Sequence, residues 1–158
     1  MCIRDSNKDV YDNATPSGTG MALTVLVRLG KLTGIEKYAA AAERGLQSLG
    51  DLFERAPTAV GQSMLALDLW LGPTQELVVA APDAASRDEV LRILRRQFRP
   101  HQVTAAVPDT GKSPLLEGIL AGKQPIAGKP SLYICENFTC QAPIVGLEAI
   151  AKELMKPL

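Results

Sequence analysis

The amino-acid sequence predicts an α+β fold, in which helical hairpins are followed by a small α/β module with three parallel strands. Two observations carry this prediction. Apolar residues recur at helical spacing through residues 17–71. From residue 76 onward, short apolar runs typical of buried strands alternate with helical patterns. We therefore place a domain boundary at Gly72-Pro73, between residues 7–72 and residues 73–158.

The first half is predicted to contain three helices, in which inner and outer helices alternate. Ser17 is the expected N-cap of the first helix, whose residues 21–32 are apolar on nearly every side, and Gly34 ends it. Residues 36–55 predict an amphipathic helix, because apolar residues repeat there at spacings of three and four. Residues 58–71 are again apolar on most sides. Helices of that kind need neighbours on each face, so these three do not close a core alone.

The second half is predicted to be a three-strand module. Residues 76–81 form a continuous apolar run, and residues 102–107 form a second strand. The helix between them, residues 86–98, begins with a capping box of Ser86 and Glu89. A strand, a helix and a strand of these lengths predict a βαβ unit with parallel strands. The remaining elements are a short helix, a third strand and a terminal helix, over residues 114–120, 131–135 and 147–155.

The helix over residues 86–98 is predicted to be amphipathic. Its core stripe consists of Val90, Leu91, Leu94 and Phe98, and arginines occupy the solvent face. Pro100 ends it.

Charge and composition narrow the class of protein. Seventeen basic and seventeen acidic residues leave no net charge, so neither a nucleic-acid partner nor an acidic membrane surface is predicted. The apolar runs are short and interrupted, so no membrane span is predicted. Three cysteines are too few for a disulfide framework, which predicts a reducing, cytoplasmic setting. No cofactor is predicted.

Residues 1–6, which include Cys2, do not share the periodicity of the rest of the chain. They look like translated adapter sequence, and we leave them out of the fold prediction. We therefore expect the natural protein to continue upstream of Asn7, and this chain to be a fragment of it.

Cys135 and Cys140 are the candidate redox residues. Four residues separate them, in a segment that begins as a strand and continues as a tight loop. Such a pair can form a reversible disulfide when the thiols are accessible; alternatively, both are small buried apolar residues at a strand end. A zinc site needs four ligands, and outside residues 1–6 only His101 offers a further one, so no metal is predicted.

A second candidate cluster lies in a segment rich in turn-forming residues near the start of the chain. Loop carboxylates can do acid–base work, which makes Asp12 and Asp9 the candidate catalytic residues. Tyr11, Asn13 and Ser17 are the candidate binding residues beside them. The alternative is ordinary turn chemistry, in which Asp and Asn side chains bond to nearby backbone groups.

Three stretches of the chain resemble one family. They are residues 9–18 (DVYDNATPSG), residues 72–79 (GPTQELVV) and residues 135–143 (CENFTCQAP). In this order and spacing they are similar to the thioredoxin-domain-containing, spermatogenesis-associated protein 20-like family of large bacterial and eukaryotic proteins. The resemblance covers residues 7–158.

The resemblance implies a thioredoxin-like domain followed by a six-hairpin α/α toroid similar to those of glycosidases and sugar epimerases. Residues 7–72 would then be the last helices of an incomplete toroid, and residues 73–158 the terminal α/β segment. The implied partner is the missing N-terminal part of the same polypeptide, with the thioredoxin-like domain and the remaining toroid helices.

Three hypotheses about function follow. The first is a C-terminal fragment with no complete active site of its own. The second is a toroid that acts on a sugar or a similar small molecule, with Asp12 as general acid or base. The third is a thiol-redox or interaction module that uses Cys135 and Cys140.

Overall fold

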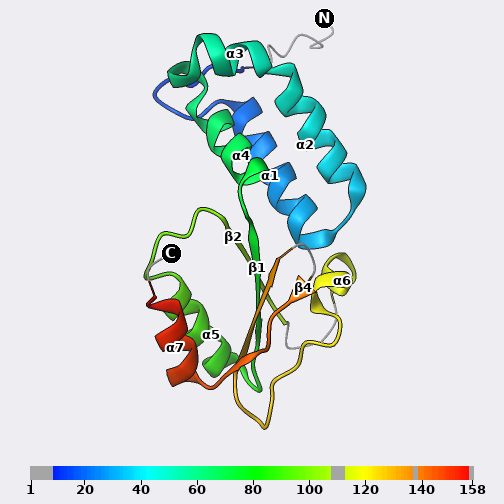
Figure 1. The fold of residues 1–158 in the computed structure, drawn as a ribbon, viewed down its shortest axis with the longest axis vertical. Helices are drawn as coiled ribbons and strands as arrows, with labels where there is room; N and C mark the ends of the chain where they lie inside the picture. The colour runs from blue at the N-terminus through cyan, green and yellow to red at the C-terminus, as the bar shows by residue number, and fades with distance from the viewer. Residues whose placement is uncertain (1–8, 108–112, 137–138, 157–158) are drawn as a thin grey trace, which may run out of the picture. The chain divides into compact units, whose positions relative to one another are not determined.

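The computed structural model describes residues 9–107, 113–136 and 139–156 and has a mixed α+β fold. Residues 1–6, for which we predict an adapter origin, lie outside these ranges. The chain forms two compact units (Figure 1). The first ends at Gly72 and the second begins at Pro73, except that Lys31–Gly34 also belongs to the second.

The first unit is helical. Its elements are α1 (Gly18–Thr33), α2 (Glu36–Ser48), α3 (Gly50–Arg55), the 3₁₀ turn η1 (Pro57–Val60) and α4 (Gly61–Leu71). The prediction of one helix over residues 36–55 is wrong in one respect. Leu49 leaves helical geometry at φ −101° and ψ 4°, so the helix is divided into α2 and α3.

The core of the first unit lies between α1, α2 and α4, which run side by side (Figure 1). Its buried residues are Leu23, Val27, Ala42, Leu46, Leu49, Ala66 and Leu69. Glycine allows the close approach of α1 and α4, because a Cβ at Gly20 would lie 2.8 Å from the Cβ of Gln62. At the end of α1, Gly34 takes a φ of 65°, which favours glycine and agrees with the predicted helix end.

The two helices predicted to be apolar all round are buried on one side only. On α1, Met21 and Val25 are one helical turn apart and about half exposed, at 47% and 49%. On α4, Leu65 and Leu71 are exposed by 59% and 73%. The first unit therefore presents apolar side chains that nothing in the described chain covers.

The second unit is built on a mixed five-stranded sheet. Its strands are β1 (Gln75–Ala80), β2 (Gln102–Ala106), β3 (Ser131–Glu136), β4 (Thr139–Cys140) and β5 (Ile144–Val145). The order is β2-β1-β3-β4, and β5 also pairs with β3. β1 and β2 are parallel and connected through α5 (Ala84–Leu94), which confirms the predicted βαβ unit.

The prediction that all strands are parallel is wrong, because β3 runs antiparallel to β1. The register explains the direction. Val79 pairs with Ala106 at the end of β2, and its neighbour Ala80 pairs with Ser131 at the start of β3. The connection therefore leaves and re-enters the sheet at the same end, which makes the next strand antiparallel.

Both faces of β1 are buried, as its continuous apolar run predicts. One face, with Leu77 and Val79, packs against α5 and α7 (Leu147–Leu154). The other face, with Val78, packs against Ile119 of the short helix α6 (Glu117–Leu120), which follows the 3₁₀ turn η2 (Pro114–Leu116). Figure 1 shows α5 and α7 together on one side of the sheet and α6 on the other.

Two details of α5 differ from the prediction. Asp83, not Ser86, is the N-cap, and its Oδ1 accepts a hydrogen bond from the Ser86 backbone N–H at 2.8 Å. The helix ends at Leu94, so Phe98 lies outside it and is 86% exposed. None of the helices in the described ranges combines the length and the apolar character needed to cross a bilayer.

Candidate functional site

Cys135 and Cys140 face each other across the antiparallel pair formed by β3 and β4. Their sulfur atoms form a disulfide between residues five apart in sequence. The two partners differ in environment, since Cys135 is 2% exposed whereas Cys140 lies exposed on the short strand β4. The structure thus has a feature of each alternative from the sequence. The two cysteines are bonded, as in the first, and Cys135 is buried at a strand end, as in the second.

Glu76 lies directly opposite Cys135 in the pairing of β1 with β3. Residues opposite each other in adjacent strands project from the same face of a sheet, with Cβ atoms about 4.5–5.5 Å apart. On the other side of β1, Glu76 pairs with Val103 of β2. Because Glu76 is only 1% exposed, its carboxyl group lies inside the protein, on the same face of the sheet as the Cys135 sulfur.

Sequence reasoning misses Glu76, because the apolar run that it begins predicts an ordinary buried strand. A signal was present. Glu is rarely fully buried without a partner group, and here it begins a run of five strand residues that are otherwise apolar. An acidic residue inside such a pattern is a reason to look for chemistry on the neighbouring strands.

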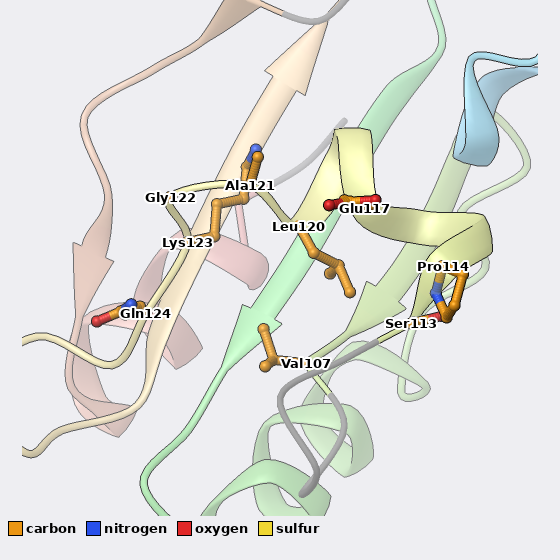
Figure 2. A pocket seen from close by; sticks show the side chains of 9 residues that line it. All are labelled: Val107, Ser113, Pro114, Glu117, Leu120, Ala121, Gly122, Lys123 and Gln124. Carbon is orange, nitrogen blue, oxygen red and sulfur yellow. The ribbon is translucent and has the colours of Figure 1, made fainter.

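Lys123 brings a positive charge to the same region. It follows α6, and in Figure 2 its side chain extends beside β3 in the direction of the strand end that holds Cys135. Partial burial disfavours the ammonium form and lowers the pKa of Lys123, whereas Glu76, when ionised, acts in the opposite direction. An ionised Glu76 therefore favours the ammonium form of Lys123.

The loop that carries Lys123 is attached to β3 by hydrogen bonds. The Tyr133 hydroxyl donates to the Gln124 carbonyl at 2.7 Å and accepts from the Gln124 backbone N–H at 3.2 Å. A cavity of about 700 Å³ lies over this part of the sheet (Figure 2). Its lining includes Val107, Glu117, Leu120, Lys123 and Gln124.

The second candidate cluster, before α1, has a different character. Both carboxylate oxygens of Asp12 accept backbone hydrogen bonds, Oδ1 from Ser17 and Oδ2 from Gln62, each at 2.7 Å. The Asp12 backbone N–H donates to the Ala59 carbonyl at 2.8 Å. Asp12 therefore connects the starts of α1 and α4, where backbone N–H groups lack helical partners.

The hydrogen bonds also determine the charge of Asp12. Donation from the Gln62 backbone N–H, and then from that of Ser17, lowers the pKa of the Asp12 carboxyl. A carboxyl with a lowered pKa is ionised near neutral pH, which suits a base or a capping group and not a general acid. A catalytic role for Asp12 or Asp9 stays a prediction.

The neighbouring residues show turn and capping contacts. Ser17 is buried, and its Oγ accepts a hydrogen bond from the Gly20 backbone N–H at 3.2 Å, which confirms it as the cap of α1. The Asp9 carbonyl accepts from the Thr19 backbone N–H at 3.2 Å. Asn13 and Tyr11 are exposed. The binding roles predicted for Ser17, Asn13 and Tyr11 stay predictions.

Within the described ranges, no group of three or more His, Cys, Asp or Glu residues could hold a metal ion. His101, the additional ligand considered from the sequence, directly precedes β2.

Comparison with known proteins adds one relative. The chain is 22% identical over 144 residues to the uncharacterized protein B0495.5 of Caenorhabditis elegans. The match covers 88% of this chain but 19% of that protein, so the chain spans about a fifth of the length of its relative. No family model and no solved structure matches the chain.

Proposed function

We propose that the second unit carries a thiol–disulfide exchange site formed by Cys135 and Cys140. The observation that supports the proposal is the bonded pair itself, with one sulfur position buried and the other exposed. An exposed partner gives an external thiolate access to the bond, and a buried partner keeps the second thiol next to the first.

The exchange begins at Cys140, the accessible partner. The thiolate of an external dithiol attacks the Cys140 sulfur, a mixed disulfide forms, and the bond to Cys135 breaks with its electron pair moving to the Cys135 sulfur. The second thiol of the reductant then displaces Cys140. The dithiol is oxidised to a disulfide and the Cys135–Cys140 pair is reduced to two thiols, with two protons transferred.

Alkylation followed by intact-mass measurement tests the proposal. The native chain is incubated with or without a dithiol reductant, blocked with iodoacetamide and weighed, and peptide mapping separates Cys2 from the pair. We expect the pair to resist alkylation before reduction. After native reduction we expect the exposed Cys140 to take up one label quickly and the buried Cys135 to take up a second label only slowly. A pair that stays unlabelled under native reducing conditions would exclude exchange.

Single replacements test which sulfur is attacked. In Cys135→Ser the remaining thiol, Cys140, is exposed, so we expect rapid formation of a mixed disulfide with oxidised glutathione. In Cys140→Ser the remaining thiol is buried, so we expect that reaction to be much slower. Equal rates for the two variants would contradict the assignment of Cys140 as the attacked residue.

We propose further that the chain is the C-terminal part of a larger protein of the spermatogenesis-associated protein 20-like family, and that its first unit completes an α/α toroid with preceding helices. The apolar side chains exposed on α1 and α4 support this, as does a relative about five times as long as the chain. A thioredoxin-like domain in the same polypeptide would then be a natural reductant for the pair.

Replacement of the exposed apolar residues tests the second proposal. We expect the isolated chain to self-associate and to bind a hydrophobic dye. The double variant Val25→Lys/Leu65→Glu should show less self-association and less dye binding. Leu115 in the second unit is 58% exposed and serves as the control site. Leu115→Glu should reduce self-association and dye binding less than the double variant does. A monomeric chain that binds no dye would argue against a covered face.

A further inference from the structure

The sheet face under α6 brings three polar or reactive groups together. Cys135 and Glu76 are opposite each other in β3 and β1, and both are buried. Lys123 lies in the loop after α6, and an ionised Glu76 acts to raise its pKa. The rest of this face is apolar, with Val78, Ala105 and Ile119. The attack on Cys140 and the breaking of the bond to Cys135 do not themselves involve the buried Glu76 carboxyl group.

Building on the proposed exchange reaction, we infer that Glu76 is the proton-transfer partner of Cys135. It gives a proton to the Cys135 sulfur when the disulfide is reduced and takes one back when the disulfide forms. The inference rests on the position of Glu76 and on the burial of both residues.

Burial explains why such a partner is needed. When the disulfide breaks, the Cys135 sulfur leaves as an anion at a position that is 2% exposed. An isolated charge is strongly disfavoured in such a place, so the thiolate must gain a proton from a nearby group. Water reaches it poorly, whereas the Glu76 side chain projects from the directly opposing position.

The balance of protons and charge is complete. As the electron pair moves to the Cys135 sulfur, the carboxylic acid of Glu76 transfers its proton, leaving a Cys135 thiol and a Glu76 carboxylate. The new carboxylate favours the ammonium form of Lys123, whose positive charge offsets part of the negative charge. When the disulfide forms again, Glu76 accepts the Cys135 proton and returns to its acid form.

Other titratable groups near the pair are less well placed. Glu136 is exposed and adjacent to Cys135 in β3, so its side chain projects from the opposite face of the sheet. His101 directly precedes β2, which is separated from β3 and Cys135 by β1. Cys140 is the exposed partner and takes its proton from solvent.

The test compares rates of reduction of the disulfide by dithiothreitol from mildly acidic to mildly basic pH. Glu76→Gln keeps the shape of the side chain and removes the ionisable proton, and Glu136→Gln is the matched control in the adjacent position. Relative to the parent chain, we expect Glu76→Gln to be reduced roughly 100-fold more slowly and to lose one ionisation from its pH profile. Glu136→Gln should match the parent.

A measurement on the unaltered chain covers the case in which Glu76→Gln does not fold. The Glu76 carboxyl carbon, ¹³C-labelled, is followed by NMR over the same pH range in the oxidised and the reduced state. We expect its titration to differ between the two states, because it shares a proton with Cys135 only after reduction. Identical titrations would overturn the inference.

The outcomes separate the inference from the function on which it rests. If dithiothreitol does not reduce the native parent chain, the exchange reaction is excluded and the role of Glu76 is excluded with it. If the parent is reduced but Glu76→Gln and Glu136→Gln follow the same pH profile as the parent, the exchange reaction stands and the role of Glu76 is overturned.

Discussion

Removal of the disulfide should destabilise the second unit by a predictable amount. The bond joins residues five apart in sequence. For a loop of this size, the loss of chain entropy in the unfolded state corresponds to about 2 kcal/mol of stabilisation at 25 °C. Cys140→Ser removes the bond at an exposed position and leaves no cavity in the core, so its effect isolates this contribution.

Native-state hydrogen exchange measures the effect in the second unit alone. Leu77 and Val79 pair with β3 in the middle of the sheet, so their amide protons exchange only when this unit opens. A loss of about 2 kcal/mol should accelerate this exchange about 30-fold in Cys140→Ser. The reduced parent chain is the control for the substitution itself, because it lacks the bond but keeps both cysteines. Its amide protons should exchange as fast as those of Cys140→Ser.

Cys135→Ser should be more destabilising than Cys140→Ser. It removes the same bond and also places a hydroxyl group at a buried position, at a further cost of about 1–3 kcal/mol unless the hydroxyl finds a partner. Unchanged amide protection in Cys140→Ser would refute the reasoning, because the bond would then place no constraint on the unfolded chain.

Three further predictions concern the rest of the fold. Leu77→Ala, at a fully buried site, should lower the free energy of unfolding by about 2–5 kcal/mol, whereas Phe98→Ala, at a site that is 86% exposed, should change it by less than about 0.5 kcal/mol in urea titrations. Gly20→Ala should destabilise the first unit by about 1–3 kcal/mol in thermal melts, because the added Cβ would lie 2.8 Å from Gln62, whereas Gly50→Ala meets nothing within 4 Å and should cause no loss. The lowered pKa of Asp12 means that its contribution to stability is present above the ordinary value of 3.8 and is lost as the pH falls through the lower folded value. The difference in unfolding free energy between the parent and Asp12→Asn should therefore shrink in acid, and a constant difference would contradict the capping role.

Local patterns in the sequence were enough to predict most of the elements. The apolar periodicity and the Gly34 helix end locate α1, and the short apolar run locates β1. The direction of β3 was not predictable in the same way, because a strand buried on both faces has the same pattern in either direction. Only the path of the connection, which re-enters the sheet where it left, determines it.

The errors at the ends of α5 have a local cause. The capping box of Ser86 and Glu89 competes with Asp83, which reaches the Ser86 backbone N–H and starts the helix earlier. At the other end, Phe98 matches the helical period, yet the helix ends at Leu94. Pro100, which is predicted to end the helix, lies well beyond Leu94, and periodicity alone cannot show that a helix stops before such a residue.

Both cysteines of the proposed exchange site were predictable from the sequence, whereas Glu76 was not. Cys135 and Cys140 are close along the chain, so their proximity was expected. Glu76 is distant from them in sequence, and only the pairing of β1 with β3 brings it opposite Cys135. Asp12 shows the reverse case, because it was selected as a candidate acid or base, and the structure gives both of its oxygens to backbone N–H groups.

A redox titration of the Cys135–Cys140 pair is the most direct test of the proposed exchange site. The chain is equilibrated in glutathione buffers of graded potential, quenched with alkylating reagent, and the fraction of labelled pair is measured by mass. We expect a midpoint above about −300 mV, inside the range in which cellular thiol systems operate. A pair that stays fully oxidised at the most reducing potential would be a structural disulfide, and a pair that never oxidises would be two ordinary thiols; either result would contradict thiol–disulfide exchange.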